Sequence, residues 1–407
     1  MLSDTVKLLF ITSSLDLTQP FSATPAWWQL LKGLYEIGVE VLATTYQGPA
    51  VESLWWRALP NPVQREGDVF KRLREMVARP TNRSTDRRTA NVDRAVSTGV
   101  SGESLSDRLQ RQLAQTVIRP KWRAFLDRTL RAQPDIDAVI FLTTPLNHLV
   151  GLAHYVSTTY HKPVIYYDGD VPASLPQFAG FASGFKIYQN ADPSEYSGFI
   201  SNSLGGIETL LTMGARRADV LYYGADPDVF SPLDATQDVD IFFYGHTREY
   251  REQWIDAMIK RPAEQLPAAR FAVRGRGLGD LGRTKMLPYL SFSKLREYSC
   301  RSKINLCVTR YAHATVNASS SSRPFELSSM GACVVSNPYH GLETWFEPDK
   351  EIIILADESE AVDRYRWLLT HDSERRAIGR AARARVLKEH TFRHRAAQLV
   401  TIVQSYL

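Results

Sequence analysis

The fold is decided by an N-terminal stretch that reads VKLLFIT at residues 6–12, PAWWQLLKGLYEIG at 25–38 and VEVLAT at 39–44. The first and last runs are short and apolar, which is typical of buried strands. Between them Pro25 suits a first helical turn, apolar side chains recur at helical spacing, and Gly38 ends the helix. A strand, a helix and a strand in this order predict a βαβ unit with parallel strands.

The same alternation recurs in two series along the chain. The first predicts strands at 138–143, 163–168, 199–202 and 220–223, with helices at 147–157 and 204–213. The second predicts strands at 240–244, 270–274, 303–309, 332–336 and 351–355, with helices at 250–260, 293–302, 324–330, 358–370, 373–389 and 392–406. A loop rich in Asp and Pro at 224–238 separates the two series.

The length also favours two domains, because the chain has 407 residues and single cores stop growing near ~250 to 300 residues. We expect an α/β protein with domains at 1–232 and 233–407, each a doubly wound, Rossmann-like sheet, and a last helix that packs back on the first domain. Such sheets bind ligands at the carboxyl ends of their strands, so the cleft between the domains is the expected site.

Residues 46–134 interrupt the first series and carry many arginines. The middle of this insertion, 80–103, is polar and lacks apolar periodicity, which is typical of a loop. Its end, 105–132, predicts a long amphipathic helix. The charge of the insertion suits an anionic acceptor, a membrane surface or nucleic acid, whereas the simpler interpretation is a solvated loop and helix. Nucleic acid is the least favoured, because base-reading motifs are absent.

Composition narrows the class of protein further. The net charge is +5, which favours phosphate-bearing ligands, and the content is 44% hydrophobic. No run approaches the ~20 apolar residues of a membrane span, and the N-terminus lacks the features of a signal peptide. Three cysteines without a CxxC pair do not form a disulfide framework. We expect a cytoplasmic protein without an integral membrane segment.

The stretch SSSSRPFELSSMGACVVS at 319–336 is the most informative for chemistry. Pro324 suits a first helical turn whose free amides, helped by the helix dipole and by Arg323, would bind phosphate. Ser322 precedes this turn, and the carboxylate of Glu326 could accept both hydroxyls of a ribose. The alternative is an ordinary helix start with a solvated glutamate.

This stretch, with Gly341-Leu342-Glu343, Glu351-Ile352-Ile353 and the ending from Glu374 to Phe392, resembles the C-terminal domain of group 1, family 4-like glycosyltransferases. The chain is most similar to their CgeB-like, spore-maturation branch, and the resemblance covers residues 238–407. It implies the GT-B fold, in which two Rossmann-like domains face each other across a cleft. One departure is that the family's first acid would stand at Ala318, as CgeB-like members often show.

The resemblance also implies which residues bind the donor, a nucleotide-sugar linked to UDP or GDP. The nucleotide would lie against Ser322, Arg323, Phe325 and Glu326. The family's pyrophosphate contacts fall at Gly245, Arg248 and Arg251, and its base-reading loop falls at Arg274 and Gly275. Because cations and amides can stabilise a departing diphosphate, we expect no metal and no further cofactor. Arg248 is therefore counted among the catalytic candidates.

The first domain offers candidates for the acceptor side. Asp168 and Asp170 end one predicted strand, and His148 follows another. Either aspartate could deprotonate an acceptor hydroxyl, and His148 could contact the donor sugar. A lone His or Asp at a strand end is more often structural, and Asp-Gly-Asp without a third ligand is poor evidence for a metal.

The function expected from these features is sugar transfer to an unidentified acceptor, with retention and without a metal. Two alternatives remain open at this point. One is a sugar-nucleotide epimerase, which shares the fold and needs no acceptor. The other is a catalytically silent nucleotide-sugar-binding subunit, which the alanine at position 318 makes plausible.

Overall fold

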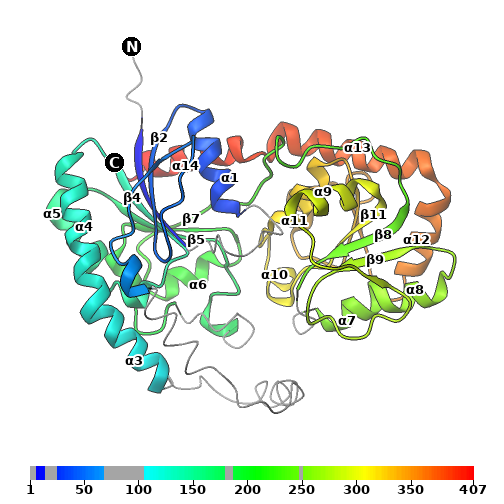
Figure 1. Ribbon diagram of the computed structural model, residues 1–407, viewed down its shortest axis with the longest axis horizontal. Coiled ribbons are helices and arrows are strands. Elements are labelled where there is room, and N and C mark those ends of the chain that lie inside the picture. The colour runs from blue at the N-terminus through cyan, green and yellow to red at the C-terminus, as the bar shows by residue number, and fades with distance from the viewer. Residues whose placement is uncertain (1–5, 14–24, 68–104, 179–186, 247–250) are drawn as a thin grey trace.

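The computed structural model describes residues 6–13, 25–67, 105–178, 187–246 and 251–407. Within them the chain forms two parallel β-sheets, each with helices packed on both faces (Figure 1). The first sheet has seven strands and the second has six. The expected pair of doubly wound α/β domains is therefore confirmed.

The first sheet has the strand order β3-β2-β1-β4-β5-β6-β7. Its register is set around β1, where Leu8 pairs with Val41 on one side and with Ala138 on the other. The strands are β1 (Lys7–Thr12), β2 (Glu40–Thr45), β3 (Arg57–Ala58), β4 (Ala138–Leu142), β5 (Val164–Asp168), β6 (Gly198–Ser201) and β7 (Ala218–Val220).

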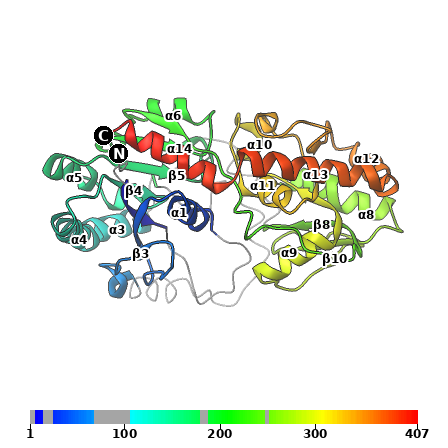
Figure 2. The same cartoon turned by 90° about the horizontal axis from the view of Figure 1, so that it is seen from above.

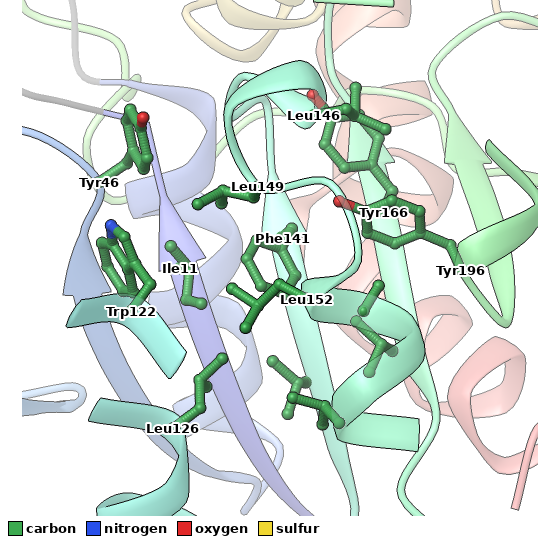
Figure 3. Packing of buried hydrophobic residues seen from close by; sticks show 14 of the residues in the cluster. Ile11, Tyr46, Trp122, Leu126, Phe141, Leu146, Leu149, Leu152, Tyr166 and Tyr196 are labelled. Carbon is green, nitrogen blue, oxygen red and sulfur yellow. The ribbon is translucent and has the colours of Figure 1, made fainter. Parts of the chain in front are cut away.

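Alternating side chains of these strands fill two cores. Leu8 and Phe10 of β1 pack under α1 (Ala26–Glu36), whereas Leu9 and Ile11 face α4 (Arg119–Ala132) and α5 (Leu152–Tyr160). Figure 3 shows the second of these cores. The predicted amphipathic helix at 105–132 is confirmed as α3 (Leu105–Leu113), a π-helical turn (Ala114–Ile118) and α4. The polar middle of the insertion, 68–104, lies outside the described residues.

The second sheet has the order β10-β9-β8-β11-β12-β13. Its strands are β8 (Val239–Tyr244), β9 (Phe271–Arg274), β10 (Lys285–Met286), β11 (Ser302–Cys307), β12 (Cys333–Ser336) and β13 (Ile353–Ile354). The helices of this half are α7 (Glu252–Ile255), α8 (Arg261–Gln265), α9 (Phe292–Arg301), α10 (Tyr311–Thr315), α11 (Ser322–Ser329), α12 (Ala361–Thr370) and α13 (Asp372–Glu389), with α6 (Ile207–Thr212) in the first half. A π-helical turn (Asp256–Lys260) joins α7 to α8.

The chain crosses between the two halves twice, and the two crossings pair with each other. Ala225 N donates to the carbonyl oxygen of His390 at 3.0 Å, and Phe392 N donates to the carbonyl oxygen of Ala225 at 3.0 Å. A Cβ on Gly224 would lie 2.5 Å from the His390 oxygen, so the backbones approach as closely as glycine allows. The two segments that connect the domains are therefore hydrogen-bonded to each other.

After the second crossing, α14 (Phe392–Gln404) lies along the first domain, beside α1 (Figure 2). Ala396, Leu399 and Val403 are fully buried in the core that α1 shares with β1 and β4. The last helix of the chain thus completes the core of the first domain. The first domain is therefore built from two separate parts of the sequence.

A third contact joins the halves at the serine loop. Ser203 pairs with Ser319 in an antiparallel bridge, and Asn202 Nδ2 donates to the carbonyl oxygen of Ser320 at 2.8 Å. Ser319 and Ser320 are fully buried. The first two serines of the run 319–322 therefore help to hold the two domains together. The helix also begins earlier than expected, at Ser322, with Pro324 still in its first turn.

Leu399→Ala should destabilise the protein by about 2 to 5 kcal/mol, because it leaves a cavity where α14 packs on the first domain. Chemical denaturation measures the loss. Thr401→Ala is the matched control on the exposed face of the same helix and should change the free energy of unfolding by less than about 0.5 kcal/mol. Equal effects of the two changes would show that α14 is not part of the first core.

Candidate functional site

Five basic side chains meet at the carboxyl ends of three neighbouring strands of the second sheet. His246 follows β8, Arg274 ends β9, Arg310 follows β11, Arg251 precedes α7 and Arg323 lies in the first turn of α11. Arg274 Nη1 lies 2.7 Å from His246 Nε2, and Arg251 Nη1 donates to the His246 carbonyl oxygen at 2.7 Å. We call these five residues the basic cluster.

The electrostatic effects within the basic cluster show how closely its charges lie. Burial, together with the nearby charges of Arg323 and Arg310, lowers the pKa of Arg251 to about 9. Burial also lowers the pKa of His246, with contributions from Arg274 and Arg323. Like charges held this closely favour an anion among them.

Aromatic rings support two of these arginines without neutralising them. The guanidinium carbon of Arg323 lies 4.4 Å from the ring centre of Tyr244, and that of Arg274 lies 4.4 Å from the ring centre of Tyr289. Cation–π contacts position a guanidinium while its full charge remains available.

Two glycines let the strand ends come together beneath the basic cluster. A Cβ on Gly275 would collide with the carbonyl oxygen of Gly245. A Cβ on Gly245 would lie 2.6 Å from the Phe243 ring and 3.3 Å from Arg323 Nη1. Gly245 and Gly275 therefore lie at the site as expected, and close backbone packing requires both of them.

Glu326 faces the first domain from inside α11. It is only 4% exposed, and Gln29 Nε2 of α1 lies 3.4 Å from its Oε1. Burial raises the pKa of Glu326 to about 7, although Arg323, Gln29 and Ser322 each act to lower it. The carboxyl group thus lies beside Ser322 and Arg323 of the basic cluster and is buried, and its contact with a ribose stays a prediction.

Phe325 does not lie in the site. It is fully buried, with its ring centre 5.6 Å from that of Trp345 and 5.5 Å from that of Phe346. The prediction that Phe325 contacts a nucleotide is therefore corrected to a core role. Successive helical residues point in different directions, so Glu326 and Phe325 cannot share one surface.

A pocket of about 280 Å³ opens at the carboxyl ends of β1, β4 and β5 in the first domain. Asp170 and Trp27 are among its lining residues, together with Ser13, Ala26, Leu30, Leu142, Thr143, Tyr167, Gly169 and Tyr223. Asp170 Oδ1 accepts from Arg310 Nη2 at 2.6 Å. The pocket and the basic cluster thus meet through one ion pair across the domain boundary.

Asp168 lies behind Asp170 and is fully buried. Its oxygens accept hydrogen bonds from Ser174 Oγ at 2.5 Å, Tyr188 Oη at 2.7 Å and the Asp170 amide at 2.9 Å. Burial raises the pKa of Asp168, which these hydrogen bonds oppose. In this structure Asp168 organises the loop that presents Asp170, so it is a positioning residue instead of the expected base.

His148 lies apart from the pocket lining. Its Nδ1 is 2.8 Å from Tyr46 Oη, and the Tyr46 ring stacks on Trp122 at 5.9 Å. Burial lowers the pKa of His148 to about 4, helped by the charge of Arg111, so the ring is neutral near pH 7. His148 is therefore a buried, neutral side chain that contacts Tyr46 in the core of the first domain. Arg248, the other catalytic candidate, lies outside the described residues.

Sequence reasoning missed Arg310, His246 and Gln29. Arg310 directly follows a predicted strand, and a basic residue at the carboxyl end of a parallel strand was a signal that could have found it. His246 lies in the sequence between Gly245 and Arg248, which were both predicted as site residues, and this position was a signal that could have found it. Gln29 gave no signal, because its contact with Glu326 joins residues 297 positions apart.

No group of three or more His, Cys, Asp or Glu side chains in the part of the chain that the structure describes is arranged to hold a metal ion. No helix there is both long and apolar enough to cross a membrane.

The solved structures that this chain resembles share its architecture over almost their whole length. Sucrose-phosphate synthase from Thermosynechococcus elongatus has a TM-score of 0.63 at 13% identity, with 98% of each chain covered. Anabaena HepE, solved in complex with UDP-glucose, has a TM-score of 0.59 at 14% identity, with 98% of this chain and 99% of that chain covered. A UDP-forming α,α-trehalose-phosphate synthase from Burkholderia vietnamiensis has a TM-score of 0.60 at 11% identity, with 98% and 100% covered. The chain therefore has the GT-B fold.

Residues 248–401 match the sequence model of a family described as glycosyl transferase-like. This match contains α7 to α13 and most of α14, and it includes Arg251, Arg274, Arg310, Arg323 and Glu326. No curated protein matches the sequence. The second domain is therefore similar in sequence to a glycosyl transferase-like family, and the whole chain shares the GT-B fold.

The buried carboxyl group of Glu326 should make stability depend on pH. Its pKa in the folded protein is about 7, above the ordinary 4.5, so the neutral form is favoured and the native state loses stability as pH rises between these values. From pH 5 to pH 8 the wild type should lose about 2 to 3 kcal/mol relative to Glu326→Gln. Urea denaturation of both proteins at each pH measures this difference.

Glu343→Gln, at an exposed position, is the control for this measurement and should track the wild type. If the wild type and Glu326→Gln keep a constant difference across this range, Glu326 titrates like an exposed carboxylate and its burial is not as described.

Proposed function

We propose that the chain transfers a sugar from a nucleotide-sugar donor, held by the second domain, to an acceptor in the pocket of the first domain. The observation that carries the proposal is the basic cluster at the carboxyl ends of β8, β9 and β11, next to Glu326. A nucleoside diphosphate brings two negative charges to such a cluster and a ribose to the neighbouring carboxylate. HepE, a structural neighbour, has been solved with UDP-glucose and with UDP, which favours a UDP-linked donor over a GDP-linked one.

In the proposed reaction an acceptor hydroxyl oxygen forms a bond to the anomeric carbon of the donor sugar. The bond between that carbon and the diphosphate oxygen breaks, and the nucleoside diphosphate leaves with the bonding electrons. The arginines stabilise the charge that develops on the leaving oxygen, which is a role that a metal ion can also fill. The hydroxyl proton passes to Asp170 or to the departing phosphate.

Retention of configuration, independence of metal and the CgeB-like assignment are parts of this proposal. An anionic acceptor is proposed from the charge of the insertion at 46–134. Arg119, one of its arginines, donates to the Val150 carbonyl oxygen at 2.9 Å, and Arg123 stacks on Tyr155 at 3.7 Å, so these two serve packing as well. An epimerase would form product without an acceptor, and a silent subunit would bind the donor without hydrolysing it; neither is favoured.

Arg323→Gln should weaken binding of UDP about 10- to 100-fold, because a hydrogen bond to a charged group contributes roughly 1.5 to 3 kcal/mol. Calorimetric titration with UDP and with GDP measures the affinity and decides the base. Arg366→Gln, an exposed arginine of α12, is the control and should bind like the wild type. Equal affinity in Arg323→Gln would remove the start of α11 from the phosphate site.

Donor hydrolysis should continue after dialysis against EDTA, since guanidinium groups supply the positive field at the leaving group. The nucleoside diphosphate released from the UDP-sugar is measured with and without added Mg²⁺ or Mn²⁺. Rates within about twofold of each other support the proposal. Complete loss in chelator, restored by a divalent cation, would contradict it.

A further inference from the structure

Arg310 lies between the two halves of the site. Its charge is one of the causes that lower the pKa of Arg251 in the basic cluster, so it shares the field of that cluster. Its Nη2 nevertheless donates to Asp170 Oδ1 of the other domain at 2.6 Å. His313, on the helix that follows Arg310, lies with Nε2 3.8 Å from the same oxygen.

Asp170 is held in place from its own side. The Gly169 amide donates to Thr143 Oγ1 at 3.1 Å, the Asp170 amide donates to Asp168, and Tyr223 Oη donates to the Gly169 carbonyl oxygen. These bonds fix the loop at the mouth of the pocket, which Asp170 lines. The carboxylate therefore faces the pocket and Arg310 together.

We propose that Arg310 changes its ion-pair partner when the donor binds. In the nucleotide-free protein it pairs with Asp170. When the diphosphate of the donor binds, Arg310 pairs with it instead, and the carboxylate of Asp170 becomes free to contact an acceptor in the pocket. This inference rests on the proposed function, because it assumes that the basic cluster receives a diphosphate. It adds Arg310 as a further donor-binding residue and makes Asp170 available only after the donor is in place.

The relative strengths of the two interactions support an exchange. The side chains of Arg310 and Asp170 are 31% and 37% exposed, and ion pairs at such positions are weak. A diphosphate in the basic cluster carries more charge than one carboxylate and meets several guanidinium groups at once. The ion pair should therefore yield to the ligand, at a small cost in affinity.

The consequence for the reaction is an order of binding. While Arg310 holds Asp170, one oxygen of the carboxylate is unavailable to an acceptor hydroxyl in the pocket. Once the diphosphate holds Arg310, both oxygens can accept hydrogen bonds from the acceptor. The acceptor site is then completed only when the donor is bound, so the donor should bind before the acceptor.

If Arg310 exchanges partners in this way, removal of the negative charge of Asp170 should raise the affinity for the diphosphate. Asp170→Asn removes the competing carboxylate, so UDP and inorganic pyrophosphate should both bind about two- to fivefold more tightly than to the wild type. Arg310→Gln should weaken binding of both ligands about five- to twentyfold. In the double variant, the change at Asp170 should have no further effect, because the guanidinium that it competes for is gone.

Isothermal titration with each ligand measures these affinities, and thermal melting confirms that each variant is folded. Asp228→Asn is the matched control, since it removes another aspartate that forms an ion pair beside the crossing between the domains, with Lys32 of α1 at 2.8 Å. It should leave both affinities unchanged. A gain in Asp228→Asn equal to that in Asp170→Asn would overturn the exchange, because general loosening of the boundary would then explain the effect.

Failure of this inference is distinguishable from failure of the proposed function. Binding of UDP that Asp170→Asn and Arg310→Gln leave unaltered would overturn the exchange and leave the proposed function standing. Weaker binding in Asp170→Asn would also overturn it, since the carboxylate would then help the ligand instead of competing with it. No binding of either ligand to the wild type would overturn both.

Discussion

The rest of the structure depends on the backbone pairing of the two crossings, where Ala225 exchanges hydrogen bonds with His390 and Phe392. If the two connecting segments crossed separately, the domains could rotate freely about them. Because the segments are hydrogen-bonded to each other and Gly224 packs on His390, the relative orientation of the domains is restricted. The antiparallel bridge between Ser203 and Ser319 adds a third point near the cleft. With these contacts in place, the loop after β5 meets the loop after β11, and the ion pair between Asp170 and Arg310 becomes possible.

In this orientation the two sides of the cleft carry opposite charges. The second domain contributes the basic cluster, and the first contributes the carboxylate of Asp170 and a pocket that contains Trp27. Rings of Tyr244 and Tyr289 hold two of the guanidiniums while preserving their charge. Glu326, also in the second domain, is kept partly neutral near pH 7 by its burial and lies against Gln29 of the first domain. The site is therefore an assembly of both domains, in which the family-matched half supplies the anion-binding groups and the other half supplies the space for an acceptor.

The sequence predicted the alternation of elements well because buried strands such as β1 and amphipathic helices such as α1 carry strong local patterns. It missed β3, β10 and α10, which have two, two and five residues, because such short elements depend on their neighbours. The structure brings Gly245, Arg251, Arg274, Gly275, Arg323 and Glu326 together, and their contacts with a nucleotide stay predictions. Phe325, Asp168 and His148 do not line the site, since burial and tertiary hydrogen bonds, which no local pattern records, decided their roles. Gln29 was missed because its partner, Glu326, comes from the opposite domain, whereas Arg310 directly follows a predicted strand and could have been found from that position.

A crystal structure of the protein with UDP tests the central claim most directly, namely that the basic cluster binds a nucleoside diphosphate. The account predicts phosphate oxygens within hydrogen-bonding distance of Arg251 and Arg323, the ribose hydroxyls on Glu326, and Arg310 turned from Asp170 to the diphosphate. A nucleotide bound in the pocket of the first domain, with the basic cluster left without phosphate, would contradict it.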